Sequence, residues 1–112
     1  MKPRRGELWF ADLGTPHGHE SGGRRPVLVV SDDGLNEGAR EVSLVVPLTT
    51  TFRGWNTHVP VQPGDSGLHR VSYAKCEDLR SVSQERLVHR IGGAPQGVMT
   101  QVSQILRHLL TL

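Results

Sequence analysis

The chain has 112 residues, a formal net charge of +2 and a single cysteine, Cys76. This length fits one domain over residues 1–112, and no apolar run approaches the ~18 residues of a membrane span. A lone cysteine cannot form an internal disulfide, which is typical of proteins of a reducing cytosol. We therefore expect a cytoplasmic protein without a membrane anchor, in which Cys76 is a small buried apolar residue.

The first half of the chain predicts three strands. ELWFADL at 7–13 is rich in apolar and aromatic residues, and PVLVV at 26–30 is an apolar run too short for a helix. A loop over 32–40 precedes VSLVVPLT at 42–49, the third expected strand. Pro47 lacks an amide donor and predicts a bulge or a sheet edge at that point.

The second half predicts shorter strands and then a helix. A polar loop at 50–56 leads to an edge strand at 57–61, and a turn at 63–67 leads to a strand at 68–76. A polar connection at 81–85 precedes a strand at 87–91. After Pro95, apolar residues recur every three or four positions, which predicts one amphipathic helix. The expected fold is a strongly bent antiparallel sheet or small barrel with a helix laid on it.

Several kinds of chemistry lack their sequence patterns. The six histidines show neither zinc-finger nor HExxH spacing, and there is no GxSxG nucleophile elbow. The glycines at 18, 22 and 23 precede a strand rather than a helix, unlike those of nucleotide-binding loops. We expect neither a metal nor a cofactor.

The segment GHESGGRRP at 18–26 is the first candidate site. Gly22 and Gly23 let the loop turn tightly, and Arg24 and Arg25 follow at the mouth of a buried strand, on opposite sides of it. At least one arginine should face the loop, where it suits a phosphate or a phosphoryl transition state. The alternative is a structural arginine paired with Glu20.

Two further polar clusters end predicted strands. Thr49, Thr50 and Thr51 offer three hydroxyls, although threonines there usually serve the strand or the turn. Strand alternation places Lys75 and Glu77 on one face, as an acid/base pair or as a plain surface ion pair. His19 adds a group that exchanges protons near neutral pH.

The loop at 50–56 holds Phe52, Arg53 and Trp55. Aromatic and guanidinium planes stack on unpaired bases in single-strand recognition. Trp55 could equally fold back as a lid on the core. The sequence leaves both interpretations open.

Four ordered blocks, RRGELWFADL at 4–13, GHESGGRRPVLVVS at 18–31, VVPLTT at 45–50 and KCEDLRSVSQERL at 75–87, precede the amphipathic helix. Together they resemble the MazF/PemK (Kid) family of toxin endoribonucleases over nearly the whole chain. The resemblance implies a small SH3-like antiparallel barrel of the CcdB/MazF type with a C-terminal helix. It also implies a homodimer that cleaves single-stranded RNA at short sequences without a metal and is neutralised by a cognate antitoxin.

The resemblance assigns roles to individual residues. Arg25 matches the catalytic arginine of the family and Thr49 the threonine that works with it, while His19 and Lys75-Cys76-Glu77 stand where the PemK-like branch has a His and an Arg-Cys-Asp triplet. Lys75 and Glu77 both depart from that triplet, so their acid/base roles are less firmly implied than that of Arg25. RNA contacts are expected from Glu20, Gly23, Arg24, Thr50, Arg53, Trp55 and Arg80.

Two other functions fit the same fold class. One is a toxin that binds a protein such as DNA gyrase, as in the CcdB family, and the other is a catalytically silent nucleic-acid-binding barrel. Arg25, Thr49 and the GHE motif favour RNA cleavage over both. We expect the antitoxin to supply an acidic, initially disordered segment that folds onto a basic groove.

Overall fold

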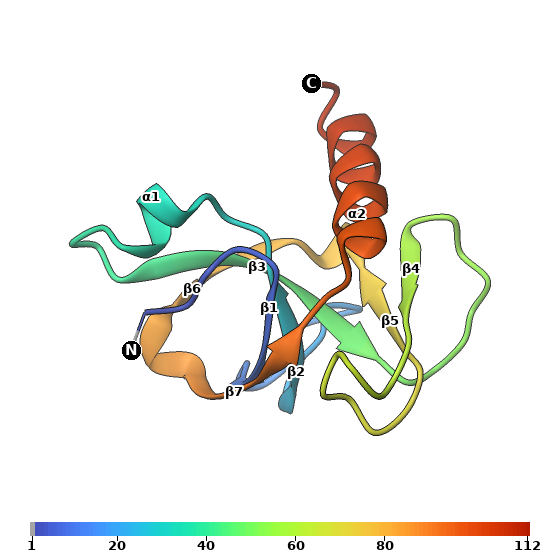
Figure 1. Cartoon of the computed structure of the whole chain (residues 1–112), viewed down its shortest axis with the longest axis horizontal. Helices are drawn as coiled ribbons and strands as arrows, with labels where there is room; N and C mark the ends of the chain where they lie inside the picture. Colours follow the sequence, from blue (N-terminus) through green and yellow to red (C-terminus); the bar gives the residue numbers. More distant parts are fainter. Residues whose placement is uncertain (1) are drawn as a thin grey trace.

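An antiparallel β-sheet and one long C-terminal helix make up the fold in this computed structural model, which describes residues 2–112 (Figure 1). The helix, α2, spans Gln96–Leu109. The strands are β1 (Glu7–Asp12), β2 (Arg24–Val29), β3 (Val42–Thr49), β4 (His58–Val61), β5 (Ser72–Lys75), β6 (Arg80–Ser83) and β7 (Leu87–Gly93). Three short helices, α1 (Asp33–Asn36), η1 (Cys76–Asp78) and η2 (Gln84–Arg86), join them.

The strands pair in the order β4-β5-β3-β2-β1-β7, and β6 pairs with β3 beside β5. A mainly β fold with a C-terminal helix is therefore confirmed. Within residues 2–112 the pairing forms an open path that ends at β4 and β7, so the hydrogen-bonded strands do not close into a ring. The edge position predicted for the strand at 57–61 is confirmed, because β4 pairs only with β5 on this path.

Apolar side chains form a core on each face of the sheet. On β2 and β3, Leu28 and Val46 belong to one core cluster and Val27 and Val45 to the other, as strand alternation requires. The first cluster includes Met99 and Val102 of α2, so the helix covers that face. Trp9, Ala11 and Leu87 join the second, which the curvature of the sheet encloses.

Three predicted boundaries are wrong. The strand expected at 68–76 is confined to Ser72–Lys75, because its partner β4 ends at Val61, which pairs with Ser72. The connection expected at 81–85 contains β6, in which only Val82 is buried. The loop expected at 32–40 contains α1, whose N-cap Asp32 accepts a hydrogen bond from the Gly34 amide.

Pro47 is not at a sheet edge. It pairs with Val27 of β2 on one side. On the other side, β6 pairs with residues 42–45 of β3 and β5 with residues 48 and 49, which leaves Pro47 between the two partners. A proline, which has no amide donor, is tolerated at this position of a central strand because neither β5 nor β6 pairs with it.

Candidate functional site

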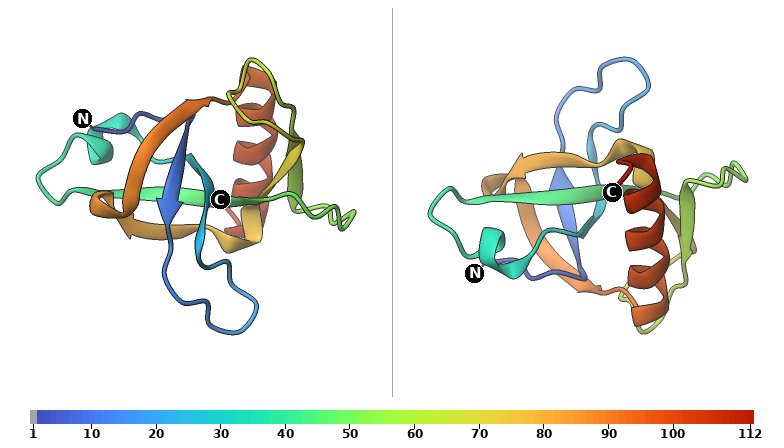
Figure 2. Two further views of the ribbon diagram at one scale, coloured as in Figure 1. Left: turned by 90° about the horizontal axis from the view of Figure 1, so that it is seen from below. Right: turned by 90° about the horizontal axis from the view of Figure 1, so that it is seen from above.

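The loop between β1 and β2, residues 13–23, is closed at its base by backbone hydrogen bonds. The amide of Gly23 donates to the Gly14 carbonyl at 2.6 Å, and the amide of Leu13 donates to the Gly23 carbonyl at 2.9 Å. Gly23 has a φ of +68°, and a Cβ on Gly22 would lie 2.6 Å from Pro16. The tight turn predicted for the two glycines is therefore confirmed. Gly23 is required by its positive φ, and Gly22 is required by the close contact of its backbone with Pro16. We call this segment the site loop; it extends away from the sheet in Figure 2.

The two arginines after the site loop lie in different environments. Arg25 is partly buried, and its Nε donates to the Gly22 carbonyl at 2.9 Å, so β2 and the loop hold it in place. Arg24, whose side chain is 65% exposed, lies 3.7 Å from Asp12. Among residues 2–112 no ion pair joins either arginine to Glu20. The prediction that one arginine faces the loop is confirmed for Arg25.

Strand register places four of the predicted site residues on one face of the sheet. Val27 pairs with Pro47, and continuing that register by two residues sets Arg25 opposite Thr49. Thr49 pairs with Tyr73, two residues before Lys75, and Arg80 pairs with Val45. Directly paired residues and alternate residues of a strand share a face. Arg25, Thr49, Lys75 and Arg80 therefore all lie on the face away from α2.

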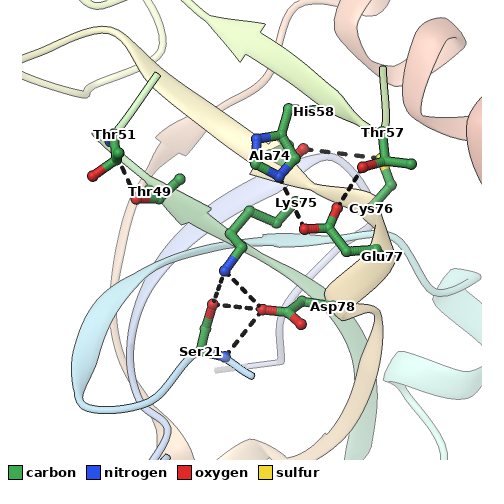
Figure 3. Close-up of polar contacts among 10 residues, drawn as sticks. All are labelled: Ser21, Thr49, Thr51, Thr57, His58, Ala74, Lys75, Cys76, Glu77 and Asp78. Atoms are coloured by element: carbon green, nitrogen blue, oxygen red, sulfur yellow. Dashed lines mark hydrogen bonds and ion pairs between the residues drawn. The ribbon is translucent and has the colours of Figure 1, made fainter. Parts of the chain in front are cut away.

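Lys75 ends β5 and enters a cluster with Ser21 and Asp78 (Figure 3). Its Nζ lies 3.0 Å from Ser21 Oγ and 3.1 Å from Asp78 Oδ2. Asp78 Oδ2 also accepts hydrogen bonds from the Ser21 hydroxyl at 2.6 Å and from the Ser21 amide at 3.0 Å. Burial raises the pKa of the Asp78 carboxyl, but these donors outweigh it, and the pKa is lowered overall. The cluster ties the site loop to η1.

Glu77 faces a different set of partners, which corrects the expected pairing with Lys75. The strand ends at Lys75 and a 3₁₀ turn begins at Cys76, so strand alternation no longer applies at Glu77. Its carboxylate accepts hydrogen bonds from Thr57 Oγ1 at 2.7 Å and contacts His58 Nε2 at 2.9 Å. Burial raises the pKa of Glu77, yet these hydrogen bonds bring it below its usual value. Glu77 is therefore a carboxylate at neutral pH.

A cavity of about 270 Å³ gathers many of the predicted residues between the site loop, the 50–57 segment and η1. A site of this kind holds acidic, basic and imidazole groups around one space, as proton transfer at a charged substrate requires. Six of its seven lining residues were expected from the sequence, and Asp78 is the addition. The lining residues are His19, Glu20, Arg53, Trp55, Lys75, Glu77 and Asp78.

The segment 50–57 projects from the sheet in Figure 2, and its two aromatic side chains contact residues of β4 and β5. Phe52 meets Tyr73 edge-on at 5.6 Å, and the ring of Trp55 lies 5.1 Å from that of His58. The Arg53 guanidinium is 5.4 Å from the centre of the Trp55 ring. Trp55 remains 51% exposed. The ring thus lies against His58 with one part and presents another part to solvent, and its stacking on RNA bases stays a prediction.

Other expected residues lie outside this cavity. Arg25, Thr49 and Arg80 share its face of the sheet without lining it, and Gly23 and Arg24 lie at the base of the site loop. Thr49 Oγ1 accepts a hydrogen bond from the Thr51 amide at 3.2 Å. Thr50 lines a separate, mostly apolar cavity of about 490 Å³ with Phe10, Pro26, Leu68 and their neighbours.

The sequence analysis did not assign Ser21, Thr57 or His58 to the site. Ser21 contacts Asp78, which is 57 positions away in the sequence, and His58 contacts Glu77, which is 19 positions away. No local sequence pattern reveals such contacts. The signal that was available is the acidic pair Glu77-Asp78 at a strand end. Cys76, expected to be buried, is confirmed as such, and burial, followed by the charge of Glu77, raises its pKa to about 12. A thiol of this kind is unreactive.

Two general features complete the description of residues 2–112. No group of three or more His, Cys, Asp or Glu side chains in this range is placed to bind a metal ion. No helix in this range has the length and apolar character required to cross a membrane.

Comparisons with known proteins agree with the fold. The family model described as PemK-like, MazF-like toxin of type II toxin-antitoxin system matches residues 4–110. Endoribonuclease MazF9 of Mycobacterium tuberculosis is 34% identical over 97% of both chains. The crystal structure of MazF from Deinococcus radiodurans, 29% identical, superposes with a TM-score of 0.86 over 100% of this chain and 99% of that one.

A third relative was solved with a partner. It is an endoribonuclease in complex with its cognate antitoxin, from mycobacterial species, and it is 27% identical with a TM-score of 0.81 over 98% of this chain and 96% of that one. The match of the family model covers almost the entire chain and includes every block of the site described above. The chain belongs to the MazF/PemK family of type II toxin-antitoxin toxins.

Proposed function

We propose that this protein is a sequence-specific, metal-independent endoribonuclease that cleaves single-stranded RNA. The observation that carries the proposal is the position of Arg25, fixed by a buried strand and by its bond to Gly22 on the face that also holds Thr49 and the 270 Å³ cavity. The endoribonucleases among its relatives support the same activity.

The proposed reaction is attack of a ribose 2′-oxygen on the adjacent phosphorus. The O2′–P bond forms, the P–O5′ bond breaks, and the products carry a 2′,3′-cyclic phosphate and a 5′-hydroxyl. Arg25 stabilises the negative equatorial oxygens, and Thr49 orients the phosphate. Lys75, on the same face, adds positive charge to the phosphate site.

Proton transfer is assigned to the two groups that line the cavity from opposite loops. The ionised Glu77 accepts the proton of the 2′-hydroxyl, and His19 gives one to the departing 5′-oxygen. Charge balances, because one proton enters the enzyme at Glu77 and one leaves it at His19.

RNA is held by the surfaces around the cavity. Trp55 and Arg53 offer planar groups for base stacking. The remaining proposed contacts are made by Glu20 and Gly23 of the site loop, by Arg24 of β2, by Thr50 directly after β3 and by Arg80 of β6.

The protein acts in the cytoplasm as a homodimer of SH3-like barrels under the control of an antitoxin. The relative solved with its cognate antitoxin supports that partner, and the large apolar residues exposed here, among them Val88, Leu109 and Leu110, suit burial against another chain. A monomer at micromolar concentration in sedimentation equilibrium would contradict the dimer.

The decisive experiment incubates the purified protein with a long single-stranded RNA in excess EDTA and maps the cut ends. Wild type should cut at one short sequence, and Arg25→Ala should lose about 10²–10³-fold in rate. Arg40→Ala is the matched control, because Arg40 is exposed and does not line the cavity. Intact RNA with the wild type would favour a gyrase-binding toxin or a silent RNA-binding protein instead, and direct binding to gyrase and to RNA would separate these two.

A further inference from the structure

His58 is a buried imidazole with one of its two nitrogens unpartnered. Its side chain is only 3% exposed and its ring lies against that of Trp55, at the first residue of β4. Nε2 lies 2.9 Å from Glu77 Oε2. Nδ1 is buried and has no hydrogen-bond partner among residues 2–112. The contact to Glu77 is therefore the only hydrogen bond that fixes the ring within this range.

The unpartnered nitrogen decides where the proton resides. Burying an N–H without an acceptor forfeits a full hydrogen bond to water, and the cost is higher when the group is charged. Glu77 is ionised and can only accept, so Nε2 must be the donor. We assign to His58 the tautomer with a proton on Nε2 and a bare Nδ1.

Two cations lie close to His58, and each has other partners. Lys75 is directly opposite His58 in the β4–β5 ladder, but its Nζ bonds to Ser21 and Asp78, and the Arg53 guanidinium lies over the Trp55 ring. The residues of α2 that line a cavity together with His58 are Gln101, Gln104 and Ile105, which carry no charge. Glu77 is accordingly held by two neutral donors, Thr57 and His58, while its carboxylate lines the cavity.

We propose that His58 is a positioning residue of the ribonuclease site, which orients the Glu77 carboxylate towards the cavity through its Nε2–H, with the Thr57 hydroxyl as second donor. The inference rests on the proposed function. A general base whose carboxylate accepts a hydrogen bond from a neighbouring side chain is held in one orientation, with its free oxygen lone pairs directed at the substrate. His58 does not touch substrate, and its effect passes through Glu77.

A spectroscopic test is independent of RNA cleavage. In ¹⁵N-labelled protein at neutral pH, the His58 ring should show a protonated Nε2 and an unprotonated Nδ1, and the Glu77 carboxyl should titrate at higher pH in His58→Phe and in Thr57→Val than in wild type. An Nδ1–H tautomer, an imidazolium, or an unchanged Glu77 titration in both variants overturns the proposal.

A kinetic test examines the coupling. His58→Phe and Thr57→Val should each lower kcat for RNA cleavage about tenfold, with KM within about twofold, since each removes one hydrogen bond to a charged group. In a Glu77→Gln background the same changes should have little further effect. Thr57→Val preserves side-chain shape and tests the second donor, and the tautomer measured in the wild-type protein covers the case in which His58→Phe does not fold.

The results of these tests distinguish a failure of the positioning role of His58 from a failure of the proposed ribonuclease function. Full kcat in His58→Phe, or an undiminished loss in the Glu77→Gln background, overturns the role of His58 while cleavage by wild type stands. Absence of cleavage by wild type instead refutes the ribonuclease proposal, and the positioning role for RNA cleavage with it, whatever tautomer the spectra show. Arg25→Ala distinguishes these cases, because its loss of activity depends on neither His58 nor Thr57.

Discussion

The two faces of the β-sheet differ in what their side chains do once the apolar centre is filled. On the face beneath α2, Leu28, Val46 and Leu48 lie fully buried along β2 and β3, and Met99 and Val102 of the helix close over them. On the opposite face, Val27 and Val45 are buried at the centre, but the same rows of side chains continue outward to Arg25 and Thr49.

This difference shows how one strand can serve both stability and chemistry. β2 carries Leu28 in the core and Arg25 at the site, three residues apart and on opposite faces. The packing of Leu28 fixes the strand, and the strand fixes the Arg25 backbone. Substitutions on the two faces should therefore separate loss of stability from loss of activity.

Leu28→Ala should give the largest effect. Removing a fully buried leucine beneath α2 leaves a cavity and lowers the free energy of unfolding by ~2–5 kcal/mol. Chemical denaturation measures this loss, and the folded fraction of the Leu28→Ala protein should cleave RNA at the wild-type rate per molecule. A lower cleavage rate per folded molecule, with little change in stability, would contradict the proposed difference between the two faces.

Arg25→Lys tests the other face. Lysine keeps the positive charge but loses the planar fork and the Nε donor that bonds to the Gly22 carbonyl. We expect cleavage to slow about a hundredfold with an unfolding midpoint close to wild type. Stopped-flow cleavage and thermal melts measure the two quantities, and wild-type cleavage by this variant would show that charge alone suffices.

The Asp78 cluster should make stability depend on pH. The pKa of Asp78 is lowered in the folded protein from its usual value of 3.8, so its contribution is fully present above that value and is lost as pH falls through the folded pKa. Asp78→Asn should cost ~1–3 kcal/mol at neutral pH, because it leaves Lys75 without its counter-charge. The free energy of unfolding, measured by urea denaturation at a series of pH values from 7 downward, should fall more steeply with pH for wild type than for the variant. Parallel plots of this free energy against pH would contradict the role of the Asp78 carboxylate.

Trp55→Ala should have the smallest effect on folding and a measurable effect on RNA. The ring is half exposed and its loss should weaken binding of single-stranded RNA by ~1–3 kcal/mol, the contribution of one stacked base. Fluorescence anisotropy with a labelled oligonucleotide measures the affinity. Unchanged affinity would assign Trp55 to covering His58 alone.

Much of the fold could be predicted from periodicity. The apolar run at 26–30, the long strand at 42–49 and the helix after Pro95 were all found, since each carries a strong local pattern. β6 and α1 were missed, because β6 holds a single buried apolar residue, Val82, and α1 is a short turn stabilised by its Asp32 cap. Packing against β3 determines β6, and such tertiary support is invisible in a short segment.

Three of the residues predicted for the site, His19, Lys75 and Glu77, line one cavity, whereas their catalytic roles stay predictions. The expected pairing of Lys75 with Glu77 was wrong, because strand alternation was extended past the end of β5 into the 3₁₀ turn. Lys75 consequently binds Asp78, and Glu77 binds His58, a residue that the chain sequence places far from it. Partners that meet only through β-sheet pairing cannot be read from local spacing.

The closed base of the site loop has a consequence for how cutting specificities can diversify. Backbone atoms of Gly14 and Gly23 hold its stem, and the strand that follows carries Arg25. The exposed side chains of Thr15 and His17 can therefore be exchanged without moving the arginine, whereas His19 must be kept for its proposed proton transfer and Ser21 must change together with Asp78. A lineage of such toxins can thus vary the exposed part of this loop while Arg25, the residue proposed to stabilise the transition state, keeps its place.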